Sequence, residues 1–243
     1  MNLSILTAAY NEEKILPVFI NHYSALAESL LAKGIINNYQ ICIVDDGSRD
    51  NTWKIIEDFH EKNSKLGGIR LDKNYGLHTA GATLIEWLEP PDLVLFLEVD
   101  NLLSEEDLIN LLESMGKNNF DTIWVQIKER DKFRHLLSGI IFNILSFFYR
   151  TKIPPNISGM LITGEIFEKL KREKIFFINY SIAKISHNSA VYQVKPVNIR
   201  RDKSRFTLIK KLKLFFSITF CNIAPFLCKK NVKIVKERMC KNA

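Results

Sequence analysis

The sequence of 243 residues contains few cysteines, and no two of the four (Cys42, Cys221, Cys228 and Cys240) form a CxxC pair. This scarcity argues against a zinc site and a disulfide framework, and it is typical of a reducing compartment. The glycine motifs GxGxxG and GxxxxGKS/T are also missing, so a nucleotide would have to be held without a glycine-rich phosphate loop. No internal repeat or low-complexity segment occurs, which leaves one large domain or a domain with an appendage.

Long apolar runs are scarce as well. The run at residues 214–228 is broken by Asn222 and Pro225, and it is shorter than the roughly 20 apolar residues of a membrane-spanning helix. Because lysines flank it on both sides, we expect either an anchor in the plane of a membrane or a packed C-terminal helix. The N-terminus lacks a basic segment and reads as a strand, so we expect no secretory signal.

Positive charge dominates the second half of the chain. The net charge is +7, and basic residues gather at 128–134 and 200–213, whereas most acidic clusters lie in the first half. A basic region favours an anionic partner such as a phosphate, an acidic lipid headgroup or a nucleic acid. The basic residues follow no aromatic-interleaved or helix-turn-helix pattern, so we expect no nucleic-acid partner.

Strand-like and helical segments alternate along the chain. Short apolar segments predict strands at residues 3–8, 39–44, 68–71, 93–97, 120–126 and 190–197. Helical patterns occupy residues 12–33, 52–61, 79–88, 104–115 and 133–149. The fourth of these helices begins with Ser104, and Asp107 follows three residues later as in a capping box. This alternation predicts an α/β fold, with a mainly parallel sheet covered by helices on both faces.

Acidic and polar residues follow the predicted strands at their carboxyl ends, where ligands bind in such sheets. They form the groups Tyr10-Asn11-Glu12, Asp45-Asp46-Gly47-Ser48, Asn74-Tyr75-Gly76 and Glu98-Val99-Asp100. The carboxylates of the last group, two residues apart, are hard oxygen ligands of the kind that Mg²⁺ or Mn²⁺ takes. The alternative for these acids is an ordinary acidic helix entry.

The second acidic group has two interpretations. Asp45 and Asp46 can accept hydrogen bonds from a nucleobase or a ribose hydroxyl, and Gly47 lets the backbone approach a ligand closely. Alternatively, Ser48 and its neighbours simply cap the next helix. His78 is by itself more typical of a hydrogen-bonding residue at a helix start than of a catalyst.

These motifs together resemble those of the family 2 glycosyltransferases of the GT-A fold. The resemblance covers about the first 125 residues, and the motifs occur in the family's order. It implies a nucleoside-diphosphate-sugar donor whose base and ribose lie near Tyr10, Glu12 and one of Asp45 or Asp46, with Asn74 and Glu98 also in the donor site. It implies that Asp100 is a metal ligand. Glu98 stands where the family usually has Asp, and we expect it to be the second ligand of the same metal.

The second half is similar to the polyprenyl-phosphate sugar transferases, a subgroup that includes dolichyl-phosphate mannose synthase. This resemblance rests on 133–138, on 158–161 and on the basic stretch 200–205. It implies that Arg134 and Ser138 help catalysis by holding the acceptor phosphate, together with Arg200, Arg201 and Ser204. Asp202 and Arg205 replace the Gly and Lys of the subgroup's basic loop, and Ile162 stands where an Arg often follows.

We therefore expect a nucleotide-sugar half at residues 1–126, an acceptor half at 127–206 and a basic, partly apolar tail at 207–243. The expected activity is metal-assisted, inverting sugar transfer to a polyprenyl phosphate, on the cytoplasmic face of a membrane to which the protein binds peripherally. Transfer to a sugar hydroxyl is the nearest alternative, although that reaction needs a general base. A catalytically inactive binding partner is another alternative, and a homo-oligomer is left open.

Overall fold

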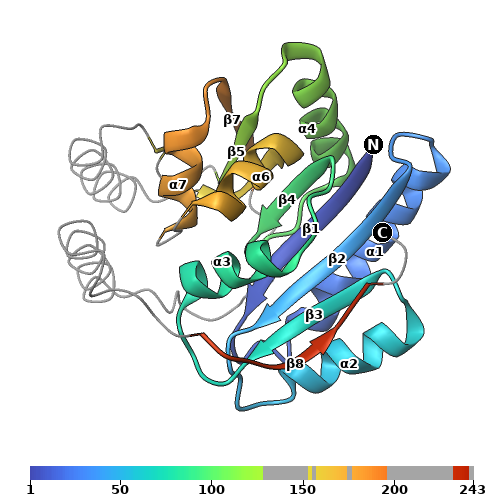
Figure 1. Ribbon diagram of the computed structural model, residues 1–243. Helices are drawn as coiled ribbons and strands as arrows, with labels where there is room; N and C mark the ends of the chain where they lie inside the picture. The colour runs from blue at the N-terminus through green and yellow to red at the C-terminus, as the bar shows by residue number, and fades with distance from the viewer. Residues whose placement is uncertain (128–152, 155–156, 174–176, 196–231, 241–243) are drawn as a thin grey trace.

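The computed structural model describes residues 1–127, 153–154, 157–173, 177–195 and 232–240 (Figure 1). The predicted helix at 133–149 and the apolar run at 214–228 lie outside these described residues.

A single mixed sheet runs through the described part of the chain, with the strand order β7-β5-β6-β4-β1-β2-β3-β8. Its strands are β1 (Asn2–Ala9), β2 (Asn38–Asp45), β3 (Leu66–Leu71), β4 (Leu93–Leu97), β5 (Thr122–Ile127), β6 (Ile157–Thr163), β7 (Ser189–Val194) and β8 (Ile234–Arg238). β1, β2, β3 and β4 are parallel, whereas β6 runs antiparallel to β4 and β5, and β8 antiparallel to β3.

Helices cover both faces of this sheet, as Figure 1 shows. One core forms where α1 (Leu16–Ala32), α2 (Thr52–Lys62) and α4 (Glu105–Asn118) pack against one face. A second core forms on the other face under α3 (Leu77–Trp87), α6 (Gly164–Arg172) and α7 (Ile178–Ile185). β2 and β4 are buried almost throughout, which explains why they read as continuous apolar runs rather than as alternating ones.

The predicted elements of the first half are confirmed. Ser104 is the N-cap of α4, as predicted, because its Oγ accepts a hydrogen bond from the backbone N–H of Asp107 at 3.0 Å and donates to Asp107 Oδ2 at 2.7 Å. α1 starts later than predicted, at Leu16, because Tyr10–Glu13 are taken up by the loop that follows β1, and Pro17 lies in its first turn. Proline suits this position, since the first N–H groups of a helix have no partner within the helix.

The last strand, β8, has no counterpart in the sequence-based prediction. It pairs with β3 at the edge of the sheet, where Figure 1 shows it in red. The predicted tail at 207–243 thus contains a strand of the central sheet, while the division of the chain into three parts stays a prediction.

Two of the cysteines lie close together. Cys240, two residues after β8, is 3.5 Å from Cys42, measured between the two Sγ atoms, and both cysteines are free thiols.

None of the helices in the described part of the chain has the length and apolar content needed to cross a membrane.

Candidate active site

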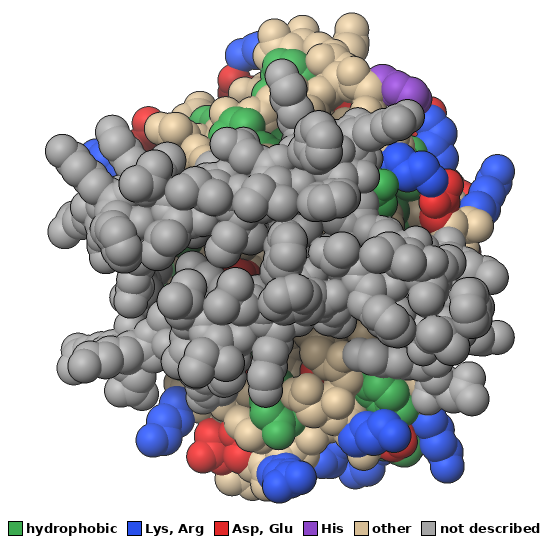
Figure 2. Space-filling view, turned by 90° about the vertical axis from the view of Figure 1, so that its left-hand side faces the viewer, with side chains coloured by type: hydrophobic (Ala, Val, Ile, Leu, Met, Phe, Trp, Pro, Cys, Tyr) green, Lys and Arg blue, Asp and Glu red, His purple; other side chains and the backbone are tan. Residues whose placement is uncertain are grey.

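The loops that follow β1, β2, β3 and β4 meet at one edge of the sheet, because the four strands are parallel and adjacent. Figure 2 looks onto the side of the molecule toward which these strands point, and Lys and Arg side chains gather along its lower margin with a few acids among them. The predicted convergence of Tyr10, Asp45, Asn74 and Glu98 on this edge is therefore observed.

The β1 and β2 loops are held together by hydrogen bonds from backbone groups. The N–H of Asn11 donates to Ser48 Oγ at 2.9 Å, and Asn11 Oδ1 accepts from the N–H of Arg49 at 2.8 Å. The N–H of Glu12 donates to Thr52 Oγ1 at 2.9 Å. Asn11 takes a left-handed backbone with φ 53°, which asparagine tolerates better than most residues. Glu12 is buried beneath this junction.

Asp45 is fully buried at the end of β2. Its Oδ1 accepts from the N–H of Ser48 at 2.9 Å, and its Oδ2 lies 3.2 Å from Nε of Arg70. That contact is an ion pair without hydrogen-bond geometry, so Oδ2 accepts no hydrogen bond within the described part of the chain. Burial raises the pKa of Asp45, although the Ser48 hydrogen bonds and the Arg70 charge oppose the shift. Within the described residues, the partner of Oδ2 is thus the charge of Arg70.

Asp46 has a different environment from its neighbour. It is also buried, but Oδ1 accepts from the N–H of Tyr75 at 2.7 Å and Oδ2 from the N–H of Gly76 at 2.8 Å. Its own N–H donates to the carbonyl of Ala9 at 2.9 Å. Asp46 therefore ties together the loops after β1, β2 and β3. Both oxygens of Asp46 are thus engaged in loop positioning, whereas Asp45 has one oxygen without a hydrogen bond from the described residues.

Gly47 makes the close approach of two of these loops possible. Its φ is +68°, and a Cβ atom built there would lie 2.4 Å from the carbonyl carbon of Lys73. Only glycine combines this left-handed backbone with such proximity. The β2 and β3 loops together enclose most of a cavity of about 460 Å³, which is lined by Tyr10, Gly47, Ser48, Arg49, Arg70, Leu71, Asp72, Lys73, Asn74, Val235 and Lys236.

Glu98 and Asp100 occupy a turn at the end of β4. Glu98 is exposed and Asp100 is half-buried. The N–H of Glu98 donates to the carbonyl of Ser158 at 3.1 Å, and the carbonyl of Glu98 accepts from the N–H of Asn101 at 3.0 Å. The backbone that carries both carboxylates is therefore held by one bond to β6 and one bond within the turn.

A buried network, which no sequence pattern indicates, fixes the far side of this turn. Asn101 Nδ2 donates to Ser158 Oγ at 2.9 Å, and the Tyr23 hydroxyl donates to the Asn101 carbonyl at 3.0 Å while accepting from the N–H of Leu103 at 3.0 Å. Burial raises the pKa of Tyr23 well above its usual value, so its hydroxyl stays protonated and can donate throughout the neutral range.

Other residues singled out from the sequence are placed as follows. His78 lies at the start of α3, with its ring 5.0 Å from that of Phe177. Among the described residues no group of three or more His, Cys, Asp or Glu gathers as a metal site. The predicted acceptor residues lie outside the described residues: Arg134, Ser138, Arg200, Arg201 and Ser204.

Residues 4–167 match the family model described as Glycosyl transferase family 2. This match spans more than half of the chain. The chain belongs to glycosyl transferase family 2.

Curated relatives of this family 2 chain are named undecaprenyl-phosphate 4-deoxy-4-formamido-L-arabinose transferase. The relative from Aeromonas hydrophila is 30% identical over 142 residues, which are 57% of this chain and 41% of the relative. The relative from Shewanella sediminis is 34% identical over 122 residues, which are 50% of this chain and 35% of the relative. The chain thus spans less than half the length of these relatives.

Solved structures with the same fold are GT-A glycosyltransferases. S. aureus TarS 1-349 in complex with UDP-GlcNAc has a TM-score of 0.59 at 16% identity, covering 90% of this chain and 65% of that one. Glucosyl-3-phosphoglycerate synthase from Mycobacterium tuberculosis, in complex with Mn²⁺, UDP and phosphoglyceric acid, has a TM-score of 0.58 at 12% identity, covering 98% and 89%. The predicted GT-A fold of this family 2 chain is confirmed.

Proposed function

We propose that the protein transfers a sugar from a nucleoside-diphosphate donor to a polyprenyl phosphate, with inversion at the anomeric carbon. The observation that carries the donor half is Asp45, a fully buried carboxylate whose Oδ2 accepts no hydrogen bond from the described residues and whose partners Ser48 and Arg70 line the cavity. A ribose hydroxyl or a base N–H can donate to that oxygen, which would remove the cost of leaving a buried acceptor unsatisfied. Tyr10 and Asn74 line the same cavity.

Glu98 and Asp100 are the proposed ligands of a divalent cation, Mg²⁺ or Mn²⁺. These two residues suit a site in which the protein supplies only one or two carboxylate ligands. Among the described residues, no group of three or more His, Cys, Asp or Glu gathers as a metal site. Such cations then take their remaining ligands from substrate phosphates and water. When bound, the cation would offset the charge of the departing nucleoside diphosphate. Two neighbours in fold, the mannosyltransferase PcManGT from Pyrobaculum calidifontis and the M. tuberculosis synthase, contain Mn²⁺.

The polyprenyl-phosphate acceptor is supported by the names of the curated relatives, which are transferases to undecaprenyl phosphate. A phosphate monoester is ionised at neutral pH, so its oxygen attacks without a general base and needs only alignment and charge balance. We assign that task to Arg134 and Ser138, with Arg200, Arg201 and Ser204. A guanidinium group suits it because it can donate two parallel hydrogen bonds to the oxygens of one phosphate. Because the acceptor is a lipid, the reaction would take place at a membrane surface, where we propose peripheral binding on the cytoplasmic face.

The test is a donor screen with Mn²⁺ and a polyprenyl phosphate, in which lipid-linked sugar is measured. We expect the wild type to form product with at least one donor. In Asp100→Ala and Arg134→Ala the rate of product formation should fall about 100-fold or more, because each variant removes a group that stabilises developing charge. Asp58→Asn, an exposed change on α2, is the matched control and should keep full activity.

The outcomes separate the alternatives. Glycosylation of an oligosaccharide hydroxyl, with no product on the polyprenyl phosphate, would reject the acceptor assignment and leave the donor assignment intact. Metal-dependent nucleotide-sugar binding without turnover on either acceptor would identify a binding protein rather than an enzyme. Full activity in Asp100→Ala would reject the metal-ligand assignment.

A further inference from the structure

The pairing of β8 with β3 is irregular beside the cavity. Arg70 pairs with Lys236 and Leu71 with Ile234, so Val235 has no partner on β3. An extra residue of this kind is a β-bulge, which redirects the neighbouring side chains and is common next to active sites. Val235 and Lys236 are the β8 residues that line the cavity, so the bulge lies at the point where β8 meets the donor site.

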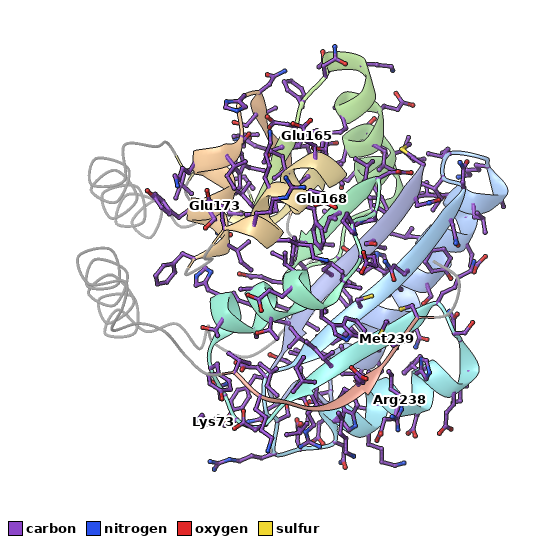
Figure 3. The ribbon with its side chains drawn as sticks, in the orientation of Figure 1. Lys73, Glu165, Glu168, Glu173, Arg238 and Met239 are labelled. Atoms are coloured by element: carbon purple, nitrogen blue, oxygen red, sulfur yellow. The ribbon has the colours of Figure 1, made fainter. Side chains whose placement is uncertain are left out.

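β8 is oriented so that its first residues reach this site. In Figure 3, Lys73, from the loop after β3, lies toward the end at which β8 begins, and Arg238 and Met239 lie toward the other end. The backbone N–H of Asp72 donates to the carbonyl of Lys233 at 3.0 Å, which fixes the entry of β8 to the β3 loop. The cavity wall thus includes residues more than 150 positions apart in the sequence.

Lys236 faces a second cation across the strands. It is the register partner of Arg70, and like charges in that position destabilise a sheet unless anions balance them. Asp45 balances Arg70 at 3.2 Å, whereas Lys236 is 3.8 Å from Glu57, whose carboxylate is already 2.7 Å from Arg238. The Lys236 side chain is 48% exposed. Its ammonium group is therefore weakly held and can turn to a ligand.

Strand order indicates which part of a donor would lie near Lys236. β1, β2 and β3 separate β4 from β8, so four strand spacings of about 4.8 Å put β8 some 19 Å from the Glu98–Asp100 turn. If the diphosphate lies at that turn, the base end of the nucleotide reaches toward β3 and β8. This step rests on the proposed function.

We propose that β8 selects the nucleobase of the donor: Lys236 donates a hydrogen bond to a carbonyl oxygen of the base, and Val235 packs against its ring. Val235 is 45% exposed at the cavity wall, so a base covering it would remove apolar surface from water. Uracil, cytosine and guanine carry a ring carbonyl and adenine does not. The site therefore favours carbonyl-bearing bases.

The experiment measures nucleotide affinity by calorimetry with the full chain in Mg²⁺, using UDP, CDP, GDP and ADP. We expect the wild type to bind one of the carbonyl-bearing nucleotides best. Lys236→Ala should weaken that binding roughly fivefold to tenfold, the range of one partly exposed charged hydrogen bond, and leave ADP unchanged. Lys233→Ala is the matched control, because Lys233 is an exposed cation just before the same strand and does not line the cavity.

A second variant separates ligand contact from anchoring of β8. Glu57→Gln removes the ion-pair partner of Lys236 and Arg238 but keeps both cations, so we expect it to keep or increase nucleotide affinity. If Glu57→Gln reproduces the loss seen in Lys236→Ala, the lysine acts by holding the strand and the proposal is overturned.

The remaining outcomes are equally decisive. An equal loss for all four nucleotides in Lys236→Ala would mean that Lys236 acts on the shared phosphates, which overturns base selection. Unchanged affinities in Lys236→Ala, with a wild type that binds, would reject this inference and leave the proposed function standing. A wild type that prefers ADP would overturn the inference as well. A wild type that binds none of the nucleotides would reject the proposed function itself.

Discussion

The carboxylate of Asp46 accepts a hydrogen bond from the backbone N–H of Tyr75 at 2.7 Å, which joins the loop after β2 to the loop after β3. Since Asp46 also accepts from Gly76, Asp46→Asn should place an amide N–H against a backbone donor. We expect the free energy of unfolding to fall by about 1–3 kcal/mol, with weaker nucleotide binding. Urea denaturation measures the first and calorimetry the second. Asp58→Asn, whose ion pair with Lys54 is exposed, should change stability by less than about 0.5 kcal/mol.

Gly47 and Gly34 have the same φ of +68° but different surroundings. Gly34→Ala should cost only the left-handed backbone strain, about 1 kcal/mol, because nothing lies within 4 Å of the new Cβ atom. Gly47→Ala adds a clash with the Lys73 backbone, and the total loss should exceed about 2 kcal/mol. Urea denaturation of the two variants compares them directly. Equal losses would mean that the β2 and β3 loops do not approach as closely as the structure shows.

Tyr23→Phe removes the hydroxyl that bridges Asn101 and Leu103 behind the Glu98–Asp100 turn. We expect a stability loss of about 1–2 kcal/mol and, if the turn holds a cation, an increase of about tenfold in the metal concentration needed for half-maximal activity. Tyr39→Phe is the control, because its hydroxyl bonds Glu28 away from the site. It should lose stability without changing the metal requirement, and a metal shift in both variants would contradict the role given to Tyr23.

The raised pKa of Asp45 predicts a pH dependence of donor binding. Burial favours the protonated form, so as the pH falls Asp45 gains its proton earlier than an ordinary aspartate, whose pKa is about 3.9. A protonated Asp45 accepts hydrogen bonds poorly, and donor affinity should decrease as the pH falls, beginning at a higher pH than it would for an ordinary aspartate. A nucleotide sugar is the suitable probe, because its diphosphate diester does not titrate there. Asp45→Asn should bind weakly with no such decline, and parallel pH profiles would contradict the prediction.

Much of the donor half was predictable from the sequence because its signals are local. Buried parallel strands such as β4 read as unbroken apolar runs, and the acids that follow them must meet at one sheet edge. The separate tasks of Asp45 and Asp46 were not predictable, because they depend on which backbone N–H groups the β3 loop presents. Arg70 gives no local signal either, because its partner Asp45 lies on a different strand.

β8 could not be predicted, because an exposed edge strand needs no apolar alternation. All of its residues are exposed, and charged side chains fill most of it, as is common for edge strands that avoid pairing with other chains. Its position depends on a backbone ladder with β3 and on ion pairs such as Arg238 with Glu57. The Tyr23–Asn101–Ser158 network was likewise invisible, since α1, the β4 turn and β6 meet only in the folded chain.

The membership of both β7 and β8 in one sheet has a topological consequence. Residues 195 and 232 belong to the same folded body, so they lie on the same side of any bilayer that the body rests on.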